Sequence, residues 1–464
     1  MGTLSSSLNI AVQAMETDQA ALGVTSNNIA NANTSGYSRQ TVDLAEVAPV
    51  TYGGLLLGDG VQLQKVVSQQ SSLLQTQLDQ ETQQQGQYNA FLGSMQQVQT
   101  LFNETSGTGL QSSITNFFNS IQQLSTNPSS TSLRAGVLTS AQNLAQNFQS
   151  TASSLVSIQR SADLSVSQSV SQINSLTAQI AQLNGEVTSA TKTGQNPGTF
   201  IDQRDQLINQ LSGLVDVSEI SAGDNGLTLT TTGGANLVVG NQSFNLTSQA
   251  DPTTGFQHVY SQGADITSSI TGGSLGGTIQ ARDSAIPSVL SSLDSLAANL
   301  ENSLNSVNQA GTDLNGDQGG NLFVPPPANG QGAASQMAVA ITDPAKIAAS
   351  LDGSTGDNSN LTAMLNVQNQ TIVQGQTPMD AYSTLVFNIG NQVSTAQSES
   401  QSSDALSQQI QNQIGSISGV SINEEAANLI QFQQAYQAAA QVASVINSLT
   451  ETAINLGHSS GATG

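Results

Sequence analysis

Apolar residues recur with helical spacing at both ends of the chain. Near the N-terminus they step by four, three, four and then seven residues, at Leu4, Leu8, Ala11, Met15, Leu22 and Ile29. Near the C-terminus they alternate by threes and fours and end on a step of seven, at Leu429, Phe432, Tyr436, Ala439, Ala443, Ile446 and Ala453, with Thr450 between the last two. This heptad pattern predicts a helix at each end. Because neither helix buries its stripe alone, we expect each to pair with the other or with a neighbouring subunit.

The middle of the chain is dominated by predicted long helices. Residues 132–184 contain no proline and keep apolar residues at helical spacing, which predicts a rod of roughly 80 Å at about 1.5 Å per residue. Further helices are predicted from about Ser68 to Leu124, over 279–307 and from Leu385 onward, and the sequence Ser421 to Glu424 is a capping box that starts the last helix. Such lengths favour an elongated architecture over a compact enzyme.

Two stretches of the chain depart from the helical pattern. Residues 41–64 alternate and contain several glycines, and 215–277 are rich in β-branched residues and glycine, which predicts extended chain and a β domain. We therefore expect a mainly α, elongated α+β multidomain protein. Its predicted parts are a terminal helical core (1–40 with 421–464), a long-helix bundle (41–214 with 278–420), a β-rich outer domain (215–277) and a small mixed outer patch (323–380).

Composition excludes several classes of function. Eight basic residues against 31 acidic ones give a net charge of −23, which opposes binding to nucleic acid and to anionic lipid. No stretch has the apolar length of a membrane span, so we expect no membrane insertion. With no cysteine and two histidines, the chain offers no disulfide and no ordinary zinc site, and we expect no cofactor. No basic residue precedes Arg39, so we expect any export to use a route other than a secretory signal peptide.

Three short motifs could indicate chemistry. Gly272 to Gly276 matches the G-x-S-x-G nucleophile elbow around Ser274, but the only later histidine is His458, near the C-terminus. The loop 311–323 begins like a calcium loop, with oxygen ligands at alternate positions from Asp313, but lacks the bidentate acid at the twelfth position. Residues 202–205 hold an acid pair that we interpret as an ion-pair cluster on a helix surface. A structural or binding role is therefore favoured over catalysis.

Longer stretches resemble a known family. Residues 26–39 and 424–440 are similar to the N- and C-terminal signatures of bacterial flagellar rod, hook and junction proteins. Residues 201–208, 310–323 and 341–348 resemble the first hook-associated protein family in particular. The resemblance covers nearly the whole chain apart from the β-rich insertion.

The resemblance implies a secreted structural protein of the bacterial flagellum, and no enzyme. It would self-assemble between hook and filament, contact the hook protein and the second junction protein, and leave by type III export with a chaperone on its C-terminal helix. The two terminal stripes would form its assembly interface and would be partly disordered in the monomer. The bend after the first helix would be shaped by Asn31, Asn33, Gly36 and Tyr37.

Three other functions remain open at this point. The first is another flagellar axial protein, which would share the terminal signatures. The second is a secreted acidic adhesin or fibre whose 215–277 region binds a ligand. The third is a serine hydrolase based on Ser274.

Overall fold

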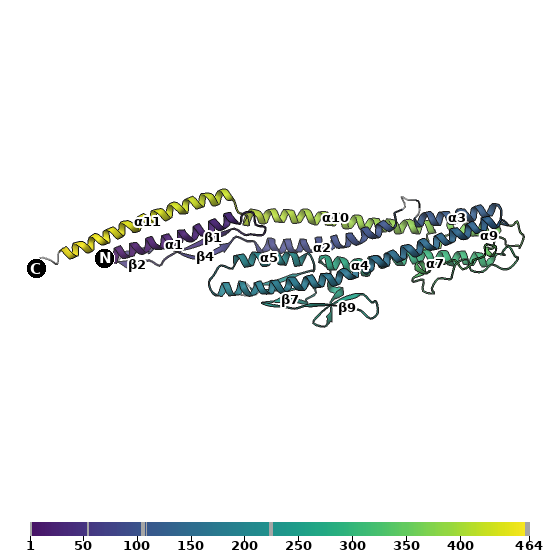
Figure 1. Cartoon of the computed structure of the whole chain (residues 1–464), viewed down its shortest axis with the longest axis horizontal. Coiled ribbons are helices and arrows are strands. Elements are labelled where there is room, and N and C mark those ends of the chain that lie inside the picture. Colours follow the sequence, from purple (N-terminus) through teal and green to yellow (C-terminus); the bar gives the residue numbers. More distant parts are fainter. Residues whose placement is uncertain (1, 53–54, 104–106, 108, 222–225, 460–464) are drawn as a thin grey trace.

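A computed structural model shows an elongated molecule built mostly of long helices (Figure 1). It describes residues 2–52, 55–103, 107, 109–221 and 226–459. A narrow arm that holds both termini extends from one end of a thicker helical bundle, and a small β region lies against the side of the bundle (Figure 1). The predicted fold class, mainly α with an inserted β region, is confirmed.

The arm has three layers, with one helix in the middle. Helix α1 (Gly2–Ala30) packs on one side against α11 (Ile422–Ser459) and on the other against a β ribbon (Figure 1). The ribbon pairs β1 (Gln40–Glu46) with β4 (Val61–Ser68), and its tip pairs β2 (Val50–Tyr52) with β3 (Leu55–Leu57). Strand pairing continues to Ser68, so the helix predicted from that residue begins later, at Ser72.

Long helices form the bundle. They are α2 (Ser72–Leu101), α3 (Leu110–Thr126), α4 (Thr131–Lys192), α7 (Ile286–Ala310) and α10 (Pro378–Ser418). The 62 residues of α4 span about 90 Å at the standard helical rise. The starts of α2, α4 and α10 are fixed by Ser71, Ser130 and Thr377, whose side chains each accept a hydrogen bond from a backbone N–H of the first turn.

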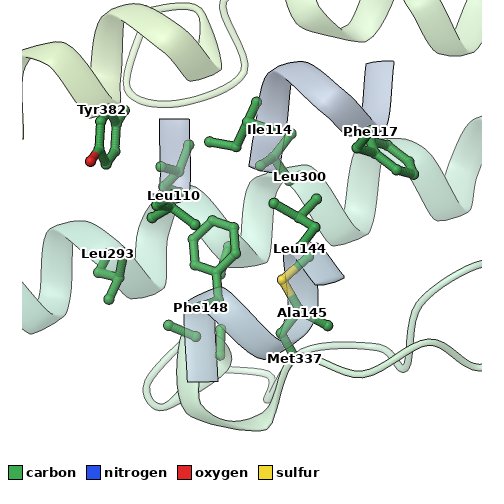
Figure 2. Packing of buried hydrophobic residues seen from close by; sticks show 14 of the residues in the cluster. Leu110, Ile114, Phe117, Leu144, Ala145, Phe148, Leu293, Leu300, Met337 and Tyr382 are labelled. Atoms are coloured by element: carbon green, nitrogen blue, oxygen red, sulfur yellow. The ribbon is translucent and has the colours of Figure 1, made fainter. Parts of the chain in front are cut away.

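The far end of the bundle holds the larger hydrophobic core. Phe148 and Leu144 of α4 pack between α3 and α7 in Figure 2, together with Met337 from a connecting segment. Phe117 makes edge contacts with Phe118 and Phe323, at ring-centroid separations of 5.4 and 5.9 Å. Aromatic side chains thus fill much of the space between the helices.

The region predicted as a separate outer patch, 323–380, supplies side chains to this same core. Short helices α8 (Ala333–Gln336), η3 (Pro344–Lys346), α9 (Ser359–Asn366) and η4 (Val367–Asn369) are joined there by loops. Leu361 and Met364 of α9 are fully buried within the bundle cluster. The sequence suggested a patch because its elements are too short to show helical periodicity, whereas their apolar residues are covered by α3 and α7.

The β region packs on the side of α4. One antiparallel sheet has the order β5 (Ser218–Ser221), β6 (Leu227–Thr230), β7 (Asn236–Val239), β8 (Gln242–Ser243). The other has the order β11 (Ala264–Asp265), β10 (Gln257–Ser261), β9 (Leu246–Ala250). Their inward residues join apolar side chains of α4 and of α5 (Gly198–Ser212) in a second core. The strands end at Asp265, and the 3-10 turn η1 (Thr267–Ser269) follows.

Helix α6 (Gly273–Gln280) and the π-helical turn η2 (Ala281–Ala285) connect the β region to α7. Helix α6 therefore begins inside the range predicted as β domain. A β-carbon at Gly277 would overlap the carbonyl oxygen of Gln87 on α2. Glycine is needed there because α6 crosses α2 in direct backbone contact.

Candidate functional site

The two terminal helices run antiparallel along each other. The end of α1 meets the start of α11, and both termini lie at the tip of the arm (Figure 1). Of the predicted stripe residues, Ala11, Ala443 and Ile446 are buried. Tyr436 and Ala453 are exposed, and the others are half-buried: Leu4, Leu8, Met15, Leu22, Ile29, Leu429, Phe432 and Ala439. Within this chain the terminal helices thus cover one another in part.

A polar cluster joins the bases of the two helices. Asn28 donates through Nδ2 to Oε2 of Glu425 at 3.0 Å and to the Gln40 carbonyl at 2.8 Å, while its Oδ1 accepts from the Tyr37 hydroxyl at 2.8 Å. Arg39 Nε donates to Oε1 of Glu425 at 2.8 Å. The Glu425 side chain is 2% exposed, so both carboxylate oxygens are held by donors in a site with little water. We call Asn28, Tyr37, Arg39 and Glu425 the clasp.

The clasp also raises the pKa of a tyrosine. Burial first, and then the nearby carboxylates of Asp202 and Glu425, raise the pKa of Tyr37 to about 12. Its hydroxyl therefore stays protonated at neutral pH and remains a donor to Asn28. The predicted turn set contained Tyr37 but not Asn28, Arg39 or Glu425. Asn28, Arg39 and Glu425 all fall inside the signature stretches 26–39 and 424–440. These stretches were the signal in the sequence that could have identified the three residues.

The turn after α1 follows the predicted geometry in part. Asn31 donates to the side-chain and backbone oxygens of Asn27 at 2.8 and 3.0 Å, which closes the last turn. Gly36 has φ of 74°, the left-handed conformation that its predicted role requires. A β-carbon at Gly36 would overlap the Gln206 side chain of α5. Asn33 is exposed.

Beyond the turn, Asp202 of α5 ties the arm to the bundle. Its Oδ2 accepts from the Ser38 backbone N–H at 3.1 Å, and its Oδ1 accepts from the Gln70 side chain. Burial raises the pKa of Asp202, and these hydrogen bonds act in the opposite direction. The interpretation of 202–205 as a surface cluster is therefore wrong for Asp202, which is 6% exposed. Helical position alone does not show that a second segment covers it.

A cavity of about 830 Å³ lies at this joint. It is lined by the turn 35–38, the start of α2, one face of α5 and the end of α10. Acidic groups gather around it: burial raises the pKa of Asp205 to about 6, although Arg204 at 3.3 Å opposes the rise. Next to the cavity, burial raises the pKa of Asp79 to about 8 against the opposing hydrogen bond from Asn209, and it raises that of Glu219 too.

The motif that resembles a calcium loop holds a lysine instead of a cation site. In the loop 311–323 the Lys346 ammonium lies 3.0 Å from Asp313 and 2.9 Å from Asp317, where a calcium ion would have to sit. Across the described residues, no cluster of three or more acidic or histidine side chains is arranged to hold a metal ion. The aspartates of this loop thus form ion pairs that fix its conformation.

The elbow motif also lacks its predicted context. Ser274 lies in the first turn of α6, and a 3-10 turn, not a strand, precedes it. Its backbone N–H donates to the Gly213 carbonyl at 2.9 Å. His458 belongs to the last turns of α11 in the arm. The glycines of the motif are explained by other close contacts: a β-carbon at Gly273 would overlap the backbone of Leu214 and Val215, and one at Gly276 would overlap the backbone of Thr271.

Among the described helices, none combines the length and hydropathy required to cross a membrane. This finding agrees with the uncharged polar character of the long helices.

Comparisons with known proteins match nearly the whole length of the chain. Residues 95–323 match the family described as "Flagellar hook-associated protein FlgK helical domain". Residues 8–37 match "Flagella basal body rod protein", and 411–456 match "Flagellar basal body rod FlgEFG protein C-terminal". The two rod-protein matches thus cover α1 and α11, the helices of the arm.

Individual relatives agree with these family matches. The chain is 31% identical to Flagellar hook-associated protein 1 of Bacillus subtilis (strain 168), over 97% of both chains. It is 28% identical to Flagellar hook-associated protein 1 of Escherichia coli (strain K12), over 98% of this chain and all of the relative. The solved flagellar hook junction protein FlgK from Burkholderia pseudomallei shares the fold, with a TM-score of 0.66 at 19% identity, over 74% of this chain and all of that chain. The resemblance seen in the sequence is confirmed: the chain belongs to the flagellar hook-associated protein 1 family.

Proposed function

We propose that this protein is a structural component of the bacterial flagellum that self-assembles into the junction zone between hook and filament. The proposal is supported by relatives that carry the name Flagellar hook-associated protein 1 and match almost the full length of both chains. It is also supported by rod-protein matches confined to the two helices of the arm and their approaches. No catalytic step is proposed, since Ser274 follows a 3-10 turn instead of the strand that a nucleophile elbow requires.

The observation that carries the proposal is the uncovered apolar surface of the arm. Helix α11 exposes large apolar side chains by 42 to 57%, namely Ile422, Ile430, Val442, Val445, Leu449 and Ile454. Three of them, Val442, Val445 and Leu449, lie within two turns of one another. Monomeric proteins rarely leave contiguous apolar surface of this kind in water, so it indicates a protein interface. The arm extends away from the bundle (Figure 1), which leaves this surface accessible.

The predicted stripes acquire a more specific role in this proposal. Their half-buried residues hold α1 against α11, and packing of arms around an axis completes their burial. In a free chain the clasp holds α11 to the base of α1, and the arm is attached to the bundle through Asp202 and the bond from the Arg39 backbone N–H to the Ser418 carbonyl. We therefore propose that it frays in the monomer and is ordered by assembly.

The proposed partners are those of the family. Other copies of this chain would surround each arm, with the hook protein on one side and the second junction protein on the other. Before assembly, an export chaperone would cover α11, and the chain would leave unfolded through the type III export channel. The absence of cysteine suits passage in an extended form.

The test is a strain that lacks the gene, complemented either by the full chain or by a chain that ends before Ser421. We expect the deletion strain to be non-motile, to build finished hooks and to release flagellin into the medium. The full chain should restore attached filaments, and the chain without α11 should not. A chain that lacks 215–277 tests the adhesin alternative. If the β region is an adhesin, this deletion should abolish ligand binding and leave flagellar assembly unaffected. Normal filaments in the deletion strain would contradict the junction role.

A further inference from the structure

Helix α11 carries a second apolar face that the heptad pattern did not reveal. Val442, Val445 and Leu449 follow one another by three and four residues, so they share one side of the helix. They are 51, 57 and 51% exposed, whereas Ala443 and Ile446 on the α1 side are each 7% exposed. No charged residue occurs over 426–450. The side of α11 that carries Ala443 and Ile446 is thus used within the chain. An adjacent side, roughly 100° around the helix, is both apolar and uncharged, and we call it the outer α11 face.

The opposite side of the arm carries another uncovered apolar face. In the ribbon, Leu44 pairs with Leu63 across the strands, and the two are 43 and 40% exposed. The tip adds Val50 and Leu56, at 43 and 72%. The register shifts between Asp43 and Leu44, and beyond this shift the leucine pair is accessible to solvent. We call Leu44, Leu63, Val50 and Leu56 the outer ribbon face.

These two faces flank the same central helix. Helix α1 packs against both α11 and the ribbon, and the apolar residues of the two faces stay exposed, so the faces do not cover each other within one chain. A single chain cannot bring them together. A second chain in a related orientation can, since its α11 can lie against the ribbon of the first.

We propose that the outer α11 face of one copy docks on the outer ribbon face of the next. The proposal rests on the proposed function and names the surfaces through which the copies assemble. Two different patches meet in this contact, so it is heterologous: each copy keeps one free face of each kind, and the contact repeats into a ring or a helical tube.

Charge favours a second copy as the occupant. Two chains of net charge −23 repel one another over most of their surfaces. The contact proposed here joins an uncharged helix segment to a ribbon region, 39–68, in which two basic residues against three acidic ones give a net charge of −1. These are faces on which two copies can approach without placing like charges opposite each other, while each removes apolar surface from water.

A disulfide experiment tests the contact directly, because the natural chain contains no cysteine. The full-length double variant V445C/L63C would be concentrated at physiological salt and oxidised. We expect a ladder of covalent oligomers on a non-reducing gel. A mixture of the two single variants should stop at dimers, since each copy then has one thiol.

The matched control is V445C/L164C. Leu164 is 66% exposed on α4, away from the arm, and a thiol there is as accessible as one at Leu63. We expect the ladder of V445C/L63C to form at least about tenfold faster than any product of the control, since docking raises the local thiol concentration.

Three results would overturn the proposal. The first is a double variant that gives no ladder, and the second is a ladder that forms equally fast in the control. The third is rapid dimerisation of V445C alone, which would show that two α11 faces meet symmetrically. The complementation test in the deletion strain does not depend on these outcomes. A junction protein that assembles through other surfaces would restore motility although V445C/L63C forms no ladder.

Discussion

Removing the Arg39 side chain should loosen α11 from the base of α1. In the clasp, Arg39 Nε donates to buried Glu425 at 2.8 Å, and its Nη1 lies 3.5 Å from Glu424 at the start of α11. The variant R39A would leave the Glu425 carboxylate, 2% exposed, with the Asn28 amide as its remaining clasp donor. A buried carboxylate that loses its cation must either take up water or separate from its site, and both open the contact between α1 and α11.

The magnitude follows from the exposure of the pair. Loss of one partner from a fully buried ion pair costs about 3–5 kcal/mol. Here Arg39 is 25% exposed, and the bond from Asn28 at 3.0 Å persists. A hydrogen bond to a charged group contributes about 1.5–3 kcal/mol, and we expect about 2 kcal/mol for the opening of α11. This corresponds to roughly 30-fold less protection of its amides.

Hydrogen exchange followed by mass spectrometry measures this effect segment by segment. Peptides from the first half of α11 should lose protection in R39A, while peptides from the middle of α4 should not change. The double variant R39A/E425Q should recover part of the loss, because it removes the unpaired charge. R160A is the matched control, since Arg160 is an exposed arginine of α4. Unchanged α11 protection in R39A, or an equal loss in R160A, would refute the reasoning.

Three further outcomes are expected. Gly36→Ala should lower the free energy of urea unfolding by more than about 1–2 kcal/mol, because the strain of the left-handed backbone is joined by a steric overlap. Gly194→Ala is the control, since Gly194 has φ of 73° in open space and should show the strain alone. Equal losses of unfolding free energy in the two variants would contradict the overlap. Burial raises the folded-state pKa of Asp79 from 3.8 to about 8, so the folded state binds more protons and stability falls as pH rises through this window. Asp79→Asn should flatten the decline of the urea midpoint between about pH 4 and pH 8, and a steeper decline would refute this account. Glu301→Gln should flatten the decline independently, because burial raises the pKa of this second carboxyl to about 8 as well. Ser274→Ala should leave motility unchanged, and a non-motile but folded variant would reopen the hydrolase alternative.

Much of the architecture could be predicted because it depends on local periodicity. The terminal stripes, the long α4 and the β-branched region each follow from spacing that a single element imposes on its own side chains. The left-handed Gly36 was likewise predictable, since glycine after a helix is a local signal. Predictions at element boundaries were less accurate. A helix was expected from Ser68, but Ser68 is the last residue of a strand and pairs with Gln40.

The site was predictable in its location and only partly in its residues. Asn28, Arg39 and Glu425 fall within the signature stretches, yet their pairing joins positions nearly 400 residues apart. Asp202 was misplaced for the same reason, because Ser38 and Gln70 cover it from outside its own helix. Periodicity records which side of an element is apolar, and it contains no information on which distant segment lies against a polar group.

The sequence by itself determined a mainly α, acidic, cysteine-free chain with heptad helices at both ends and a flagellar signature. Only the tertiary structure decided that α1 is shared between α11 and the ribbon, and that Val442, Val445 and Leu449 stay exposed. The physical reason is that α11 has more apolar surface than one neighbouring helix can cover. Which side is buried within the chain, and which is left for a partner, depends on the packing of segments that are distant in sequence.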